Sequence, residues 1–88
     1  MENAWDDVNE QMEEAKKLVR QGDKSPLYFL MIKNLMDLSI LSSYTGFWKF
    51  KLRRHFKPAV YEKLSDKILL KYAEAFSMTL NELKEFEV

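Results

Sequence analysis

The sequence predicts an all-α fold, a compact domain of five or six helices that forms one unit over its 88 residues. Apolar residues recur at spacings of three and four along most of the chain, as on helices that bury one side. Capping residues precede these segments, and only two glycines and two prolines interrupt the chain. No segment alternates apolar and polar residues long enough to indicate a strand. Helices joined by short turns are therefore expected throughout.

The first expected helix covers about residues 3–20 and is amphipathic. Its apolar residues follow at helical spacing and are Trp5, Val8, Met12, Ala15 and Val19. Acidic residues crowd its first turns and basic residues its last, which suits the helix dipole, and Gly22 ends it. We therefore predict an acidic amphipathic helix over residues 1–24, in addition to a helical domain over residues 25–88.

The second expected helix begins at Ser25-Pro26, because serine is a good N-cap and proline suits the first helical position. The stretch that follows, LYFLMIKNLM, is apolar nearly all round, so this helix is expected at the centre of the core. Met31 and Met36 are predicted to fill that core. A short third helix, LSILSSYT, is expected to begin after Asp37 as its cap.

A basic and aromatic helix is expected next, over residues 48–56. Residues 45–58 contain five lysines and arginines, one histidine and four aromatic residues, and no acid. On a helical wheel, Trp48, Leu52 and Phe56 form an inner seam at spacing four. Phe50 is left over on the basic face, where an exposed aromatic ring is a candidate contact with a partner.

Two further helices are expected after Lys57-Pro58, since the residue before a proline avoids the helical region. The segment AVYEKL is interpreted as a connection to the helix DKILLKYAEAFS, which Ser65 caps. Thr79 and Glu82 have the spacing of a capping box for a last short helix.

Charge is distributed unevenly, although the formal net charge of the chain is zero. Residues 1–24 carry seven acids and four bases, whereas residues 48–63 carry six bases and one acid. Such a concentration of positive charge favours a local surface for an anionic partner. The alternative is an ordinary solvated face whose lysine and arginine stems cover the core.

The segment 37–58, DLSILSSYTGFWKFKLRRHFKP, resembles the helix-turn-helix of Cro and phage-repressor-like DNA-binding domains. The residues that carry the likeness are Asp37 at the cap, Leu41 and Ser42 where Leu-Ala is usual, Gly46 at the turn and Leu52 at the aliphatic position. Downstream, LLKYAEAF and TLNEL are similar to later helices of such domains, so the likeness covers about residues 26–85. Two departures are the serine at position 42 and the Trp-Lys-Phe at positions 48–50, where the family mostly has polar residues.

This resemblance implies a small DNA-binding protein that regulates transcription, with double-stranded DNA as its partner. The absence of cysteine fits a cytoplasmic location. The expected DNA-contacting residues are Lys49, Phe50, Lys51, Arg53, Arg54, Lys57 and Lys63. Aromatic side chains at positions 48 and 50 can contact thymine methyl groups or sugars. Because one short recognition helix reads few base pairs, a homodimer is expected, with Trp5, Val8 and Met12 as candidates for its surface.

The sequence gives no support to catalysis, so no enzyme, cofactor, metal or small-molecule substrate is expected. His55 is the only histidine, no residues at metal-ligand spacing accompany it, and we interpret it as a surface or DNA-backbone contact. The chain has no cysteine, no phosphate-binding glycine loop and no nucleophile elbow. It also has no apolar run near 18 residues, which predicts that it does not span a membrane.

Two other functions remain open at this stage. The chain can be a protein–protein interaction module whose helix-turn-helix-like fold does not bind DNA. Packing of residues 1–20 on residues 48–57 would favour that function, because it would consume the basic face within the chain. Attachment to anionic lipid through Trp48, Phe50 and Phe56 is the other, although so small a domain needs its aromatic residues in the core.

Overall fold

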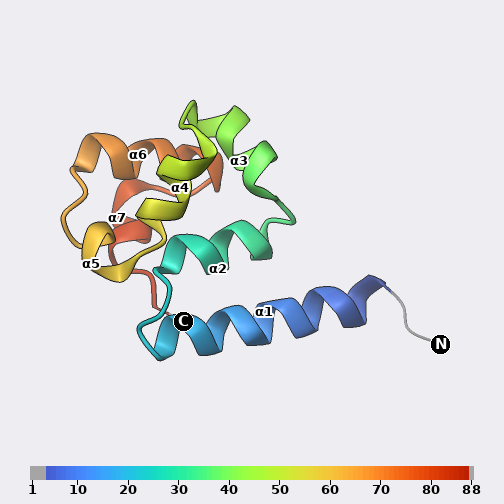
Figure 1. Ribbon diagram of the computed structural model, residues 1–88. Helices are drawn as coiled ribbons and strands as arrows, with labels where there is room; N and C mark the ends of the chain where they lie inside the picture. Colours follow the sequence, from blue (N-terminus) through green and yellow to red (C-terminus); the bar gives the residue numbers. More distant parts are fainter. Residues whose placement is uncertain (1–3, 88) are drawn as a thin grey trace.

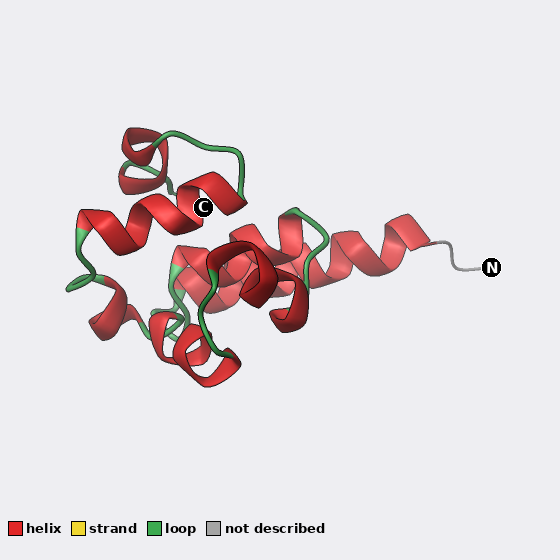
Figure 2. Ribbon diagram, turned by 90° about the horizontal axis from the view of Figure 1, so that it is seen from above, coloured by secondary structure: helices red, strands yellow, loops and turns green. Residues whose placement is uncertain are grey.

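The computed structural model describes the backbone of residues 4–87 and the side chains of residues 9–87, and within that part the chain is entirely helical (Figures 1 and 2). The helices are α1 (Ala4–Arg20), α2 (Pro26–Lys33), α3 (Leu38–Thr45), α4 (Lys49–His55), α5 (Pro58–Tyr61), α6 (Asp66–Ala75) and α7 (Leu80–Lys84). The prediction of an all-α fold is confirmed. The described residues form seven helices rather than five or six, because Pro58 starts a single helical turn in the segment that the sequence predicts to be a connection.

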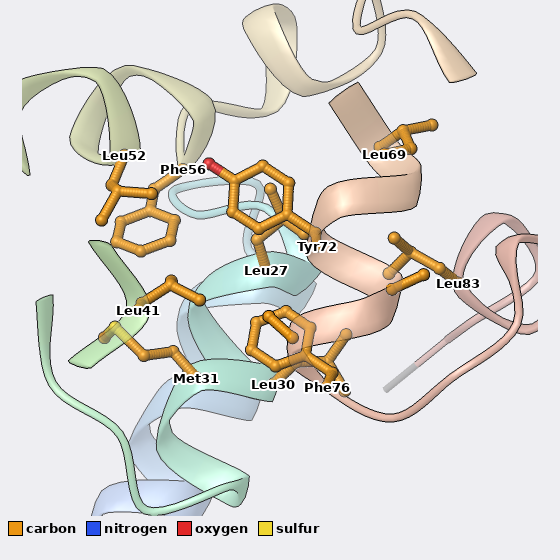
Figure 3. Close-up of a cluster of buried hydrophobic side chains, with 12 residues drawn as sticks. Leu27, Leu30, Met31, Leu41, Leu52, Phe56, Leu69, Tyr72, Phe76 and Leu83 are labelled. Atoms are coloured by element: carbon orange, nitrogen blue, oxygen red, sulfur yellow. The ribbon is translucent and has the colours of Figure 1, made fainter. Parts of the chain in front are cut away.

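The hydrophobic core lies between α2, α3, α4, α6 and α7 (Figure 3). Its largest members are Leu27, Leu30, Met31, Leu41, Leu52, Phe56, Leu69, Tyr72, Phe76 and Leu83. Helix α2 buries residues on more than one side, as its nearly uniform apolar sequence predicts. Met31 is buried as expected, whereas Met36 is half-buried at the edge of the core.

Helix α1 packs along α2, whereas α4 packs against α3 and α5 (Figure 1). Ala15 is fully buried and Met12 half-buried, so the second half of the predicted apolar stripe lies in the molecule. The first half of α1 projects beyond the end of α2 in both views (Figures 1 and 2). Trp5 and Val8 lie in this half, outside the described side chains. The packing of the acidic helix on α4, which would have consumed the basic face, is therefore not the arrangement of this fold.

Capping residues start three of the helices as the sequence predicts. The Asp37 carboxylate accepts a hydrogen bond from the Ile40 amide at 2.8 Å, and the Ser65 hydroxyl caps α6. Thr79 and Glu82 form the complete capping box of α7. Ser25 precedes α2, but its hydroxyl donates instead to the carbonyl of His55 at 3.0 Å, so it fastens the start of α2 to the end of α4.

Candidate nucleic-acid interface

The turn between α3 and α4 is closed by hydrogen bonds that its own side chains make. Gly46 has a φ of 80°, in the left-handed region that glycine adopts without strain. The Ser42 hydroxyl donates to the carbonyl of Phe47, and the Thr45 hydroxyl accepts from the Phe47 amide at 3.3 Å. Serine at position 42 therefore makes a contact across the turn that alanine cannot make.

Helix α4 has one buried face and one charged face. Leu52 is fully buried and Phe56, just after the helix, is 3% exposed. The residues on the other side are exposed, and together with Trp48 they form what we call the basic-aromatic surface: Trp48, Lys49, Phe50, Lys51, Arg53 and Arg54. Phe50 is 64% exposed, which agrees with its expected place on the basic face. Since Leu41 of α3 is also fully buried, Leu41 and Leu52 anchor the two helices in one core.

Trp48 does not belong to the inner seam, and this part of the sequence prediction is wrong. Its side chain is 77% exposed. The reason is local: Trp48 is the N-cap of α4 and has a ψ of 153°, so the spacing of a helical wheel does not apply to it. Phe47 takes the inner place instead, with its ring centroid 5.4 Å from that of His55 and 5.6 Å from that of Tyr72.

His55 is a core residue, so the prediction of a surface or backbone-contacting histidine is also wrong. It is 4% exposed, and its Nδ1 lies 2.6 Å from the hydroxyl of Tyr72 in α6. Burial lowers the pKa of His55, and the positive charges of Lys51 and Arg54 lower it further. The neutral imidazole thus joins α4 to α6 beneath the basic-aromatic surface.

Lys71 of α6 adjoins the basic-aromatic surface, although it is far from that surface in the sequence. Its Nζ lies 5.6 Å from the centroid of the Phe47 ring, and the Nζ of Lys51 lies 5.0 Å from the same centroid. Both ammonium groups are therefore within cation–π distance of one aromatic ring. In the sequence, the only indication for Lys71 is that it follows Lys67 by four residues, which places both exposed lysines on one face of α6.

Lys57 and Lys63 are exposed but lie outside α4. Lys57 is the N-cap of α5 and directly follows the end of α4, so it extends the basic-aromatic surface along the chain. Lys63 follows α5 in the turn that leads to α6, and all of α5 separates it from α4.

The cations of the basic-aromatic surface are free of acidic partners among the described side chains. The ion pairs found there are Lys16 with Glu13 at 3.4 Å and Lys84 with Asp66 at 3.0 Å. Neither pair involves a residue of α4. The positive charge of this surface is consequently available to an external anion.

Other kinds of site find little support within residues 9–87. No three histidine, aspartate or glutamate side chains gather there in a group that could hold a metal ion. No described helix combines the length and the apolar character needed to cross a bilayer.

In comparisons with protein-family models, with curated proteins and with solved structures, the chain has no significant match.

Proposed function

We propose that the protein binds double-stranded DNA through the basic-aromatic surface and thereby regulates transcription. The observation that carries this proposal is the outer face of α4, where four cations flank an exposed phenylalanine and have no acidic partner among the side chains of residues 9–87. Lys49, Lys51, Arg53 and Arg54 are those cations. Together with Lys57, Lys63 and Lys71, they can neutralise several phosphates.

The dimensions of α4 suit the major groove. An α-helix with its side chains is about 10–12 Å in diameter, and the major groove is about 12 Å wide. In the arrangement that we propose, α3 and α4 form a repressor-like helix-turn-helix and α4 is its recognition helix. The cap at Asp37, the left-handed turn at Gly46 and the buried Leu41 and Leu52 support this arrangement.

The two arginines and the two aromatic residues have different tasks in this proposal. Arg53 and Arg54 are the candidates for guanine, because a guanidinium can donate two hydrogen bonds to one guanine edge. Phe50 and Trp48 expose apolar rings that water solvates poorly, so thymine methyl groups and sugars are their candidate contacts. Lysines hold the phosphates and set the strength of binding without regard to sequence.

The second candidate is a protein–protein interaction module, and a specific observation favours it. Tyr44 of α3 is 65% exposed, so exposed aromatic residues occur on both helices of the motif. A protein partner with an acidic and apolar surface would fit such a face as well as DNA does. The two candidates predict different results with duplex DNA alone: the first predicts that the protein binds it, and the second predicts that it does not.

Fluorescence anisotropy of a labelled random-sequence duplex, titrated at about 50 mM and about 200 mM salt, tests the proposal. We expect a log–log salt slope of about −4 to −5, which corresponds to four to six neutralised phosphates. The double variant Arg53→Glu/Arg54→Glu is expected to abolish the binding. A matched control is Lys17→Glu/Lys33→Glu, which changes the net charge equally on α1 and α2 and should weaken binding much less.

A folded wild-type protein that shows no binding at the lower salt concentration contradicts DNA binding and favours the protein–protein module. Equal loss in the two double variants also contradicts the proposal, because binding would then follow net charge and not the basic-aromatic surface.

A further inference from the structure

We propose that a shallow pocket beside Trp48, in the turn between α3 and α4, takes an unpaired nucleobase, so that the protein prefers duplex DNA in which one base is bulged out of the stack. This inference rests on the proposed DNA-binding function, to which it adds the feature of DNA that the basic-aromatic surface selects. It gives Trp48 a stacking contact with the face of a base, beyond the contacts with thymine methyl groups and sugars.

The pocket lies where the chain passes from α3 into α4. Ser42, Gly46, Phe47 and Trp48 line it, and its volume is about 200 Å³. A Cβ atom placed on Gly46 would meet no atom within 4 Å, so the backbone of the turn leaves this side of the pocket open. Trp48 is 77% exposed at the same place. A flat ligand can therefore reach the pocket directly from solvent.

Phe47 gives the pocket a fixed wall. Its ring lies edge to face against that of His55, and its centroid is 5.6 Å from that of Tyr72 in α6. The backbone of Phe47 is held as well, because its carbonyl accepts from the Ser42 hydroxyl and its amide donates to the Thr45 hydroxyl. A wall that is already ordered loses little conformational entropy when a ligand binds.

Trp48, in contrast, carries an aromatic ring without an aromatic partner. The ring pairs and cation–π contacts among the described side chains do not include it. Its indole is a large apolar surface that water solvates poorly, so stacking on a second π-system is favourable. Nucleobases are the π-systems of the proposed partner, and every base has a face on which an aromatic side chain can stack.

Cations beside the pocket favour a base that belongs to a nucleic-acid strand. The ammonium groups of Lys51 and Lys71 lie 5.0 Å and 5.6 Å from the centroid of the Phe47 ring. Lys49 directly follows Trp48 and is exposed. These positive charges suit the phosphates that flank a base in a strand, whereas a neutral aromatic ligand would gain nothing from them.

The preference for an unpaired base follows from the free energy of unstacking. In a regular duplex the neighbours cover both faces of every base, and turning one base outward requires that it be unpaired and unstacked. A bulged base has no pairing partner, so less free energy is needed to bring it to the indole. Stacking of one base on an aromatic side chain raises affinity roughly 5- to 150-fold, and we expect the bulged duplex to be favoured within that range.

Anisotropy titrations of two labelled duplexes test this inference, where the duplexes share one sequence and one of them contains an extra unpaired adenine. The wild type is expected to bind the bulged duplex about five-fold tighter or more. Trp48→Ala should bind both duplexes equally, and Trp48→Phe, which keeps a smaller aromatic ring, should retain part of the preference. Phe50→Ala is the matched control: it removes another exposed ring, one that does not line the pocket, and should weaken binding to both duplexes by the same factor.

Replacement of the bulged adenine by the fluorescent base 2-aminopurine reports the stacking itself, because its fluorescence falls when it stacks on an aromatic ring. We expect quenching by the wild type and by Phe50→Ala, but not by Trp48→Ala. Thermal unfolding verifies that the last variant is folded. Since the side chain of Trp48 is exposed, its Tm should lie within about 4 °C of the wild type.

The outcomes separate this inference from the function on which it rests. Equal affinity of the wild type for the two duplexes contradicts the inference and leaves the proposed function standing. A preference that Trp48→Ala retains in full does the same, because the base would then be held elsewhere. Failure of the folded wild type to bind either duplex contradicts the proposed function itself, and the inference with it.

Discussion

A neutral imidazole fastens α4 to the rest of the molecule. Burial raises the pKa of Tyr72, so its hydroxyl stays protonated and can donate a hydrogen bond to Nδ1 of His55. The carbonyl of His55 accepts from the Ser25 hydroxyl, and the Phe47 ring meets the imidazole edge to face. One residue therefore connects α2, α4 and α6 directly below the proposed DNA-binding surface.

We expect stability to fall on mild acidification because of His55. Its pKa in the folded protein is below the ordinary value of 6.5, so the unfolded chain takes up the proton first as the pH is lowered. The stabilisation by the neutral imidazole is complete above about pH 6.5 and is lost as the pH falls through the lowered folded-state pKa. Urea denaturation at several pH values between about 8 and about 5 measures the effect.

The His55→Gln variant is the control for this prediction. It cannot titrate in that range, so its free energy of unfolding should vary less with pH than that of the wild type. Parallel pH profiles for the two proteins would show that the carboxylates and not His55 cause the change.

Helix α4 has only seven residues, and in the proposed function these residues must both pack in the core and contact a partner. Leu52 is fully buried and Phe50 is mostly exposed, although only two positions separate them. We expect Leu52→Ala to lower the free energy of unfolding by about 2–5 kcal/mol, because it leaves a cavity between α3 and α4. Phe50→Ala should change stability by less than about 0.5 kcal/mol and should weaken DNA binding instead.

Urea denaturation and the anisotropy titration, carried out on both variants, check this division. A large loss of stability in Phe50→Ala would mean that its ring packs in the fold and is not held ready for a partner. Full DNA binding by that variant would remove Phe50 from the proposed contacts.

Most helix boundaries could be predicted because they depend on local chemistry. Asp37, Ser65 and the Thr79–Glu82 pair act within four residues of themselves, so their effect is readable along the chain. Two of the wrong predictions concern positions that are not part of a long regular helix. The spacing of a helical wheel does not apply to Trp48, because it is a cap, and the turn at Pro58 is too short to show a periodic pattern.

At the scale of the whole molecule, the acidic and basic parts of the chain are kept apart. Helix α1 lies along α2, and α4 lies on the other side of α2 beside α3 (Figure 1). Although the net charge of the chain is zero, its acidic residues therefore weaken the local field of the basic-aromatic surface less than direct ion pairs would. The sequence does not predict which segments pack against α4, because packing between distant segments leaves no periodic signal. For this reason the position of Lys71 beside α4 and the burial of His55 were not predicted.

Lys71 offers the test of whether the DNA-binding surface extends from α4 onto α6. If its ammonium contacts a phosphate, Lys71→Gln should weaken binding about equally for all DNA sequences and make the salt slope shallower by about one. The variant loses its cation–π contact with Phe47, which should lower the free energy of unfolding by no more than about 1 kcal/mol. Lys33→Gln on α2, which is also an exposed lysine but stands outside the proposed surface, is the control and should leave the slope nearly unchanged. Equal salt slopes for the two variants would confine the contact surface to α4 and its flanking turns, because a phosphate contact by Lys71 must release a counterion that Lys33 does not.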